Sequence, residues 1–218
     1  MRLRAPSTAG PYGIEPAVHF DFLSADEVFG QNLVLYPLTN RPPVSGGMTT
    51  NGSTQYATFN LANYTVVFGG GAPGEISIYC EFIPEFDYAE AVTRSIWDST
   101  TVNYAAQREA TAPDYVLRFW LGNFTIVCSV PCATYGPLWR TNARNKTLVA
   151  GVSGANRAYL NGTLISSTAT AWSRSAVPPQ LYFSMTPGVT FPFDGTTVDY
   201  RVFNRQLNAA ECVEMTTL

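Results

Sequence analysis

Alternation of apolar and polar residues in short segments constrains the fold of this chain more than any other feature. In residues 75–83 the apolar side chains stand at every second position, which is the pattern of a strand with one buried face. Glycine, proline and asparagine separate such segments, and no amphipathic pattern of three or more helical turns is present. The sequence therefore predicts an all-β fold with two antiparallel sheets. We expect strands at residues 18–23, 32–36, 56–61, 64–68, 75–83, 115–121, 147–153, 157–160, 163–166, 189–193 and 197–203.

Two dipeptides, Asn161-Gly162 and Asp194-Gly195, each stand between two expected strands. Both tolerate the positive φ that a two-residue hairpin turn requires, so each predicts a hairpin. Near the end of the chain, Asn208 is followed three residues later by Glu211, which is the chemistry of a helix N-cap. We expect one helical turn near residues 208–214.

The length and composition indicate one folded domain with an extension. The 218 residues suffice for a single β-sandwich, which we place at residues 17–218, and the proline- and glycine-rich residues 1–16 predict an extended arm. Charged residues make up only 13% of the chain and the net charge is −3, which excludes a strongly basic nucleic-acid surface. No apolar run approaches the roughly 18 residues of a membrane span, and no signal peptide is expected.

The last third of the sequence contains several short segments that together resemble the conserved segments of one protein superfamily. They are Leu138-Trp139 and residues 148–152, 157–165, 181–184, 193–196, 198–207 and 209–211. Together they resemble the laminin-G-like, concanavalin-A-like lectin-glucanase jelly-roll superfamily, and residues 75–83 resemble one of its inner strands. The resemblance implies a two-sheet antiparallel jelly-roll sandwich. It does not define the function, because this fold carries lectins, adhesion modules, hydrolases and structural proteins.

Extracellular members of this superfamily often hold calcium through acidic side chains and carbonyl oxygens. The candidates in the matching segments are Asp194 and Asp199. Because Asp-Gly at a turn more often serves the turn itself, we assign no metal and no cofactor, and calcium stays an open alternative.

An acidic segment follows residues 75–83. Glu85, Asp87 and Glu90 resemble the E-x-D-x-x-E signature of family-sixteen glycoside hydrolases, in which one glutamate is the nucleophile and the other the general acid. Pro84 interrupts the preceding strand, which favours an exposed acidic loop. We therefore predict that the chain is not an enzyme, with a glycoside hydrolase using Glu85 and Glu90 as an alternative.

Two other reactive residue types have simpler interpretations. His19 is the only histidine and lies within an expected strand, and the chain has no Gly-x-Ser-x-Gly turn, so we interpret it as structural. Cys128 and Cys132 lack the second pair of ligands that a zinc site needs. They form either a local disulfide or two free thiols.

Tryptophan rings can supply flat surfaces for sugar rings. Trp97, beside Asp98, and Trp172, in the polar stretch before Arg174, are expected to be more exposed than the other tryptophans. We name Trp97, Asp98, Trp172 and Arg174 as the candidate residues for binding a glycan or a protein partner.

These observations favour a non-enzymatic structural and binding protein on the surface of a virion or similar particle, such as a bacteriophage capsid decoration or tail-associated protein. The low charge content, with no basic residue between residues 42 and 93, favours a surface covered by partner subunits. The arm at residues 1–16 is expected to contact neighbouring subunits, and the domain is expected to be able to adhere to surface glycans. Such a protein would be made in the host cytoplasm. A free carbohydrate-binding lectin module is the alternative.

Overall fold

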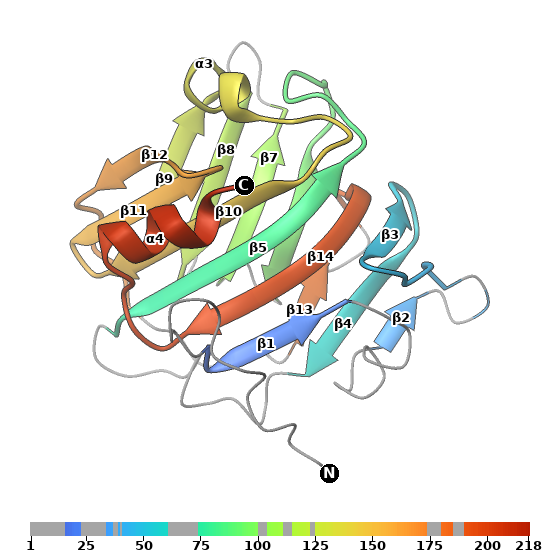
Figure 1. Ribbon diagram of the computed structural model, residues 1–218, viewed down its shortest axis with the longest axis horizontal. Helices are drawn as coiled ribbons and strands as arrows, with labels where there is room; N and C mark the ends of the chain where they lie inside the picture. Colours follow the sequence, from blue (N-terminus) through green and yellow to red (C-terminus); the bar gives the residue numbers. More distant parts are fainter. Residues whose placement is uncertain are drawn as a thin grey trace.

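A computed structural model describes residues 16–22, 34–36, 39, 41–60, 74–99, 104–110, 115–122, 125–173, 180–184 and 190–218. These residues form two antiparallel sheets packed face to face, which confirms the predicted all-β sandwich (Figure 1). The arm predicted at residues 1–16, apart from Pro16, and the strand predicted at residues 64–68 lie outside the described residues. Within the described part, no helix has the length and apolar character needed to cross a membrane.

Each sheet has seven strands among the described residues. The front sheet has the order β1 (Val18–Asp21), β14 (Asp194–Phe203), β5 (Ile76–Pro84), β10 (Asn145–Val152), β11 (Ala155–Leu160) and β12 (Thr163–Thr168), and β3 (Met48–Asn51) also pairs with β14. The back sheet has the order β2 (Val34–Tyr36), β4 (Tyr56–Asn60), β13 (Gln180–Phe183), β6 (Arg94–Ser99), β7 (Tyr104–Glu109), β8 (Val116–Leu121) and β9 (Ile126–Pro131).

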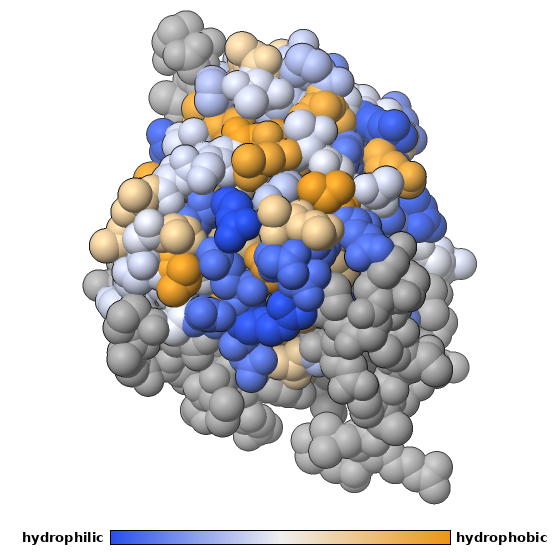
Figure 2. Space-filling view, turned by 60° about the vertical axis from the view of Figure 1, so that its left-hand side comes forward, coloured by the Kyte–Doolittle hydropathy of each residue, from blue (hydrophilic) through white to orange (hydrophobic). Residues whose placement is uncertain are grey.

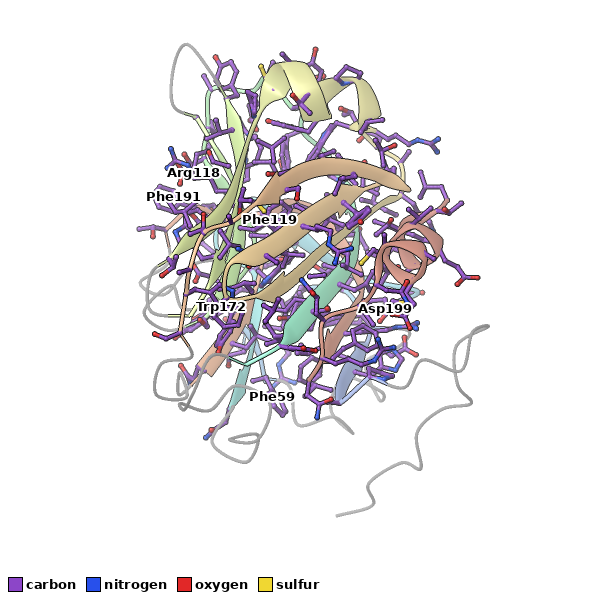
Figure 3. All side chains as sticks on the ribbon, turned by 90° about the vertical axis from the view of Figure 1, so that its left-hand side faces the viewer. Phe59, Arg118, Phe119, Trp172, Phe191 and Asp199 are labelled. Carbon is purple, nitrogen blue, oxygen red and sulfur yellow. The ribbon has the colours of Figure 1, made fainter. Side chains whose placement is uncertain are left out.

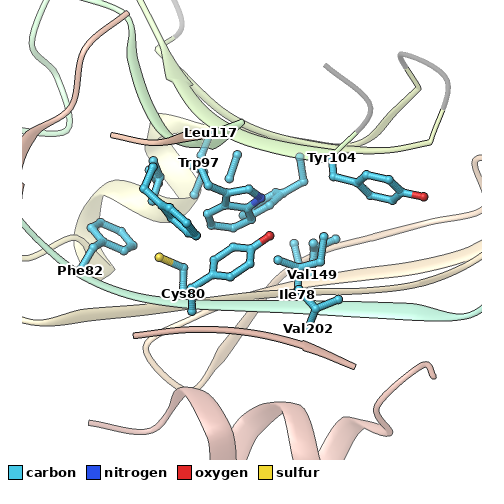
Figure 4. Close-up of a cluster of buried hydrophobic side chains, with 14 of the residues drawn as sticks. Ile78, Cys80, Phe82, Trp97, Tyr104, Leu117, Val149 and Val202 are labelled. Atoms are coloured by element: carbon cyan, nitrogen blue, oxygen red, sulfur yellow. The ribbon is translucent and has the colours of Figure 1, made fainter. Parts of the chain in front are cut away.

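The core lies between the two sheets, where alternate side chains of each strand point inward. On β5, Ile78 and Cys80 are fully buried in this core, as the alternation predicted. Figure 4 shows them beneath Trp97 and Leu117 of the back sheet. Phe119 on β8 also enters the core, while its neighbour on the strand faces away from it (Figure 3).

The hairpin predicted at Asn161-Gly162 is confirmed. Asn161 has a φ of 49° and Gly162 a φ of 81°, and they join the antiparallel strands β11 and β12. The Asn161 side chain also accepts a 2.8 Å hydrogen bond from the Lys146 N–H and donates one of 2.8 Å to the Leu138 carbonyl. The turn is therefore fixed by its backbone preference and by its side chain.

The hairpin predicted at Asp194-Gly195 is wrong. Asp194 begins β14, and Gly195 lies within that strand opposite Pro84 of β5. Gly195 has a φ of +142°, and a Cβ there would lie 2.2 Å from the carbonyl oxygen of Ile83. The glycine therefore permits a close strand approach and not a turn, and the described part of residues 189–193 forms no strand.

The predicted C-terminal helix is α4 (Ala209–Thr216), and it has a full capping box. The Asn208 side chain accepts the Glu211 N–H at 3.0 Å, and the Glu211 carboxylate accepts the Asn208 N–H at 2.8 Å. The helix lies on the outer face of the front sheet (Figure 1). It covers a second apolar cluster, made of Tyr79, Leu148, Ala150, Tyr159, Phe203, Leu207 and Cys212, with Met215 packed against it.

Two tryptophans expected to be exposed are buried, so that expectation is wrong. Trp97 has no exposed surface and packs edge-on against Tyr200 with ring centroids 5.7 Å apart. Trp172 is only 5% exposed, and it donates from its indole N–H to Asn156 and from its backbone N–H to the Ser153 hydroxyl. Strand alternation directs Trp97 into the core, and hydrogen bonds to Asn156 of β11 and to Ser153 hold Trp172 in its buried position.

We predict that Trp97→Ala lowers the free energy of unfolding by about 3–5 kcal/mol, because it leaves a large cavity between the sheets. Chemical denaturation of both proteins measures the difference. The control Val92→Ala, at a position 44% exposed, should change stability by less than about 0.5 kcal/mol. Equal stabilities of the Trp97→Ala variant and the parent would contradict the core position.

Candidate functional site

The acidic segment after β5 is a loop held by its own hydrogen bonds. Glu85 is exposed, and its backbone N–H donates to the Asp194 carbonyl at 2.9 Å. Asp87 is also exposed, and its carboxylate accepts the N–H of Ala89 at 2.9 Å in a local turn. Both carboxylates therefore belong to an exposed loop, which is the interpretation that Pro84 favoured.

The third acid of this segment, Glu90, is engaged by arginines. Arg94 binds both of its carboxylate oxygens, at 3.1 and 2.9 Å, and a guanidinium nitrogen of Arg108 lies 3.7 Å away. Arg108 is completely buried, donates to the backbone carbonyls of Glu90 and Val92, and has its pKa lowered by that burial. Glu90 therefore organises the loop, and the three acids have separate partners.

Of the four residues proposed for binding, the three that the structure describes are not brought together. Trp97 points into the core, whereas Asp98, the next residue on β6, faces the opposite side of the back sheet. Trp172 lies after β12, and Arg174 lies outside the described residues. Asp98 is therefore the one candidate that the structure places on an outer sheet face.

Asp98 borders a group of residues that we call the tyrosine patch: Tyr56, Thr58 and Asn60 of β4, and Gln180 and Tyr182 of β13. Their strand neighbours Ala57, Phe59, Leu181 and Phe183 are buried in the core, so alternation directs these five outward. Thr58 pairs with Tyr182, and Tyr182 pairs in turn with Asp98. The alternation within β4 and β13 was the available sequence signal for this patch, which the sequence analysis did not identify.

Two aromatic rings form the centre of the patch. Tyr56 and Tyr182 are stacked, with ring centroids 6.1 Å apart and planes at 28°, and both are half-buried. The Tyr182 hydroxyl donates to the side-chain oxygen of Gln180 at 2.7 Å. The pair is a half-buried aromatic surface beside the amides of Gln180 and Asn60, and the neighbouring Thr58 is buried.

Asp98 is a buried acid beside this surface. It has no exposed area, its Oδ2 accepts a 2.8 Å hydrogen bond from the Gln107 amide, and its Oδ1 has no hydrogen-bond partner within the described residues. Burial raises the pKa of Asp98 to about 7, although hydrogen bonds from the Ser99 backbone and Gln107 oppose the rise. A buried carboxyl of this kind marks a functional-site candidate.

Polar residues continue from Asp98 across the outer face of the back sheet. Gln107 on β7 pairs with Arg118 on β8, and Arg118 pairs with Ser129 on β9. Figure 3 shows Arg118 on the outside of the sheet and Phe119 on the inside. The Arg118 guanidinium lies 2.5 Å from the Glu109 carboxylate, so its charge is already balanced.

The front sheet contains His19 on β1 and the two calcium candidates, Asp194 and Asp199, on β14. On its outer face, Asp199 is paired with cationic side chains. His19 Nε2 lies 3.0 Å from Asp199 Oδ1, and Arg201 donates twice to Asp199 Oδ2. Burial alone would raise the pKa of Asp199, but hydrogen bonds from His19 and Arg201 outweigh it and lower that pKa. Asp199 is thus committed to cationic side chains, and the described His, Cys, Asp and Glu residues form no group of three or more that could hold a metal.

The four cysteines are free thiols, which resolves the two alternatives left open for Cys128 and Cys132. Cys128 is buried at the edge strand β9, and burial raises its pKa. Cys132 begins the short helix α3 (Cys132–Tyr135), which continues into the 3₁₀ turn η1 (Gly136–Leu138). Neither thiol belongs to the tyrosine patch.

No protein-family model and no curated protein matches the sequence. Solved structures resemble the fold. Domain 4 of AbnA, a GH43 extracellular arabinanase from Geobacillus stearothermophilus, in complex with arabinotriose, is 14% identical with a TM-score of 0.55, over 78% of this chain and 76% of that one. The CBM40 of Ruminococcus gnavus IT-sialidase, bound to α2,3-sialyllactose, is 15% identical with a TM-score of 0.55, over 79% and 96%.

A third similar structure is Trypanosoma rangeli sialidase in complex with sialic acid, at 14% identity and a TM-score of 0.55. The match covers 79% of this chain but only 27% of that protein. At these identities the comparisons show the fold alone: an all-β sandwich of two antiparallel sheets.

We predict that Asp98→Asn makes the protein more stable than the parent at about pH 8, by up to about 4 kcal/mol, and equally stable at about pH 4. Because the folded pKa of about 7 lies above the unfolded value of 3.8, the unfolded state loses its proton first. The free energy of unfolding of the parent therefore decreases as the pH rises from about 3.8 to about 7. Asparagine does not ionise, so the variant does not show this decrease. Chemical denaturation of both proteins at each pH measures the effect.

The matched control is Asp87→Asn, which removes an exposed carboxylate. It should change stability by less than about 0.5 kcal/mol at either pH. An Asp98→Asn protein that is less stable than the parent at about pH 8 would show that the ionised carboxylate is stabilised in the fold.

Proposed function

We propose that this chain is a non-enzymatic glycan-binding domain and that the tyrosine patch contacts the sugar. The observation that carries the proposal is the stacked pair Tyr56 and Tyr182, half-buried on the outer face of a sheet and bordered by amide and hydroxyl side chains. An aromatic face packs against the C–H groups of a sugar ring, and amides donate and accept hydrogen bonds with its hydroxyls.

The comparisons support this proposal without deciding it. Two proteins with a similar fold were solved with sugars bound, one with arabinotriose and the other with α2,3-sialyllactose. Because a shared fold does not establish a shared ligand, the proposal depends on the residues of the patch.

A hydrolase is the weaker alternative for this chain. Retaining glycoside hydrolysis needs two carboxyl groups about 5 Å apart on either side of the bond to be cleaved. Glu90 is bound at both oxygens by Arg94, and Glu85 is exposed on the loop before it. These contacts support a structural role for the acidic segment.

We predict that Tyr182→Ala weakens glycan binding at least about tenfold, because the sugar loses an aromatic contact worth about 1.4 kcal/mol or more. Isothermal titration with the best glycan from an array measures the change. Tyr182→Phe should retain most of the affinity, since it keeps the ring and loses only the hydroxyl that donates to Gln180.

The double variant Glu85→Gln/Glu90→Gln is the control for the hydrolase alternative. It should bind the same glycan as tightly as the parent, and neither protein should release reducing sugar from it. Hydrolysis that the double variant loses would establish the alternative, and unchanged binding by Tyr182→Ala would remove the tyrosine patch from the site.

We further propose that the domain works on the surface of an assembly such as a virion, as the low charge content predicted. One side supports this location: residues 163–173 contain no charged side chain, Leu164 on β12 is 48% exposed and Ile126 on β9 is 38% exposed. The two edge strands are joined by a 2.5 Å hydrogen bond from the Thr168 hydroxyl to the Val127 carbonyl. Figure 2, which brings this side forward, shows orange apolar residues among pale ones in its upper part and blue hydrophilic residues at its centre.

We predict that the purified full chain has a mass that is a multiple of 23.8 kDa in light scattering, and that Leu164→Asp shifts it toward the monomer. A charge at this position is costly to bury against another subunit. Val92→Asp, at an exposed apolar position outside β9 and β12, should leave the mass unchanged. A monodisperse monomer at all concentrations would count against the assembly proposal.

A further inference from the structure

We propose that Asn51-Gly52 is a site of spontaneous deamidation in the folded chain, where water converts the asparagine to aspartate and isoaspartate through a succinimide. This inference is independent of glycan binding. It is carried by the hydrogen bonds around the Asn51 side chain, and by their contrast with those at Asn161-Gly162, the other Asn-Gly dipeptide of the sequence.

The reaction is an attack of the Gly52 backbone nitrogen on the side-chain carbonyl carbon of Asn51. The nitrogen gives up its proton and bonds to Cγ, and an electron pair of the carbonyl moves onto Oδ1. When the carbonyl forms again, the Cγ–Nδ2 bond breaks, and Nδ2 takes a proton from water and leaves as ammonia. Water then opens the succinimide at either carbonyl, which returns a proton to the Gly52 nitrogen and leaves aspartate or isoaspartate.

Three backbone N–H groups converge on the Asn51 oxygen that becomes negative in this reaction. Oδ1 accepts the N–H of Ser53 at 3.2 Å, that of Thr54 at 3.0 Å and that of Gln55 at 3.1 Å. Donors that are already oriented toward a developing oxyanion stabilise the transition state. The turn after β3 therefore forms an oxyanion hole around its own asparagine.

The attacking and leaving groups at this site are available for reaction. The Gly52 N–H has no hydrogen-bond partner in the part of the chain that the structure describes. Asn51 is exposed, and its Nδ2 donates to the exposed Thr54 hydroxyl at 3.3 Å, which is a long hydrogen bond. Ammonia can therefore leave into solvent without breaking a strong contact.

The Asp194 carboxylate lies beside Gly52 and can act as the base. A Cβ on Gly52 would lie 2.6 Å from Asp194 Cγ and 2.9 Å from its Oδ1. Gly52 has a φ of +61°, which glycine adopts without strain, so no side chain separates its backbone from the carboxylate. Asp194 can accept the Gly52 proton directly or through one water.

The same dipeptide at Asn161-Gly162 is held against this reaction. The Gly162 N–H donates to the Thr216 hydroxyl at 3.2 Å, so attack would break that hydrogen bond. Asn161 Nδ2 donates to the Leu138 carbonyl at 2.8 Å and to Asn145 Oδ1 at 3.0 Å, so loss of ammonia would take the donor from both acceptors. The fold therefore protects one Asn-Gly turn and activates the other.

The products change the end of β3. Asn51 lies opposite Asp194 in the pairing of β3 with β14. Aspartate in place of Asn51 would put two negative charges on a cross-strand pair, which is destabilising. Isoaspartate adds a carbon to the main chain and disturbs the register of the strand. Conversion therefore weakens the attachment of β3 as the protein ages.

The experiment incubates the folded full chain at mildly alkaline pH and follows both asparagines by peptide mapping with mass spectrometry, which resolves the acid from the amide. We expect Asn51 to convert at least about tenfold faster than Asn161, because only Asn51 has the set of donors that stabilises the oxyanion. In denaturant both sites lose their native contacts, so the two rates should become equal, and Asn51 should react no faster than in the folded chain.

Variants test the assigned groups. Asn51→Gln should abolish the fast conversion, because the longer side chain does not form the succinimide. Asp194→Asn should slow conversion of Asn51 about tenfold and leave Asn161 unchanged, since it removes the base. Asp194→Glu, which keeps a carboxylate, should react faster than Asp194→Asn, and Asp87→Asn, at an exposed acid, should leave both rates unchanged.

The outcomes that would overturn the inference are equal rates at Asn51 and Asn161 in the folded chain, or a faster reaction of Asn51 in denaturant than in the fold. A fast conversion that persists in Asn51→Gln would place the modification elsewhere. An unchanged rate in Asp194→Asn would remove Asp194 from the reaction. These measurements use no glycan, so they stand or fall separately from the proposed function.

Discussion

Aromatic packing between the sheets is the interaction on which the rest of this structure depends. Phe183 of β13 contacts Phe20 of β1 and Tyr200 of β14 with ring centroids 5.4 and 5.0 Å apart, and Trp97 of β6 lies 5.7 Å from Tyr200. These contacts join strands of both sheets, and large buried rings dominate the free energy of such a core. Because strand side chains alternate, fixing Phe183 and Trp97 inward fixes Tyr182 and Asp98 outward.

The elements that sequence reasoning recovered are those whose signal is local. The alternation in β5, the Asn161-Gly162 turn and the Asn208–Glu211 capping box each depend on residues a few positions apart. The strands β6 and β7 were not predicted, because they contain buried arginine, aspartate and glutamine that interrupt the apolar pattern. Some of their polar groups have partners more than ten residues away, such as the backbone carbonyls that accept from Arg108, and no local pattern shows those partners.

The candidate site divides in the same way. Asp98 was named as a candidate because it is next to Trp97 in the sequence. In the structure, strand alternation places Trp97 on the opposite face of the sheet, so this reason was wrong. The tyrosine patch depends on the pairing of β4 with β13, two short strands far apart in the chain, so alternation within each strand does not show that their outward residues lie side by side. The prediction of a hairpin at Asp194-Gly195 was wrong for a related reason. Glycine is required there by the close approach of β5, which is a tertiary contact that the local sequence does not show.

The buried carboxyl of Asp98 lowers the stability of the fold near neutral pH. Burial raises its pKa to about 7, so near neutral pH part of the population carries a charge that the fold disfavours, and only one of its oxygens has a described partner. An asparagine would accept the Gln107 amide equally well without that cost, so packing alone gives no reason for an acid here. The aromatic core supplies the stability that offsets this cost, so the inner face of the back sheet stabilises the sandwich while the outer face carries a buried acid.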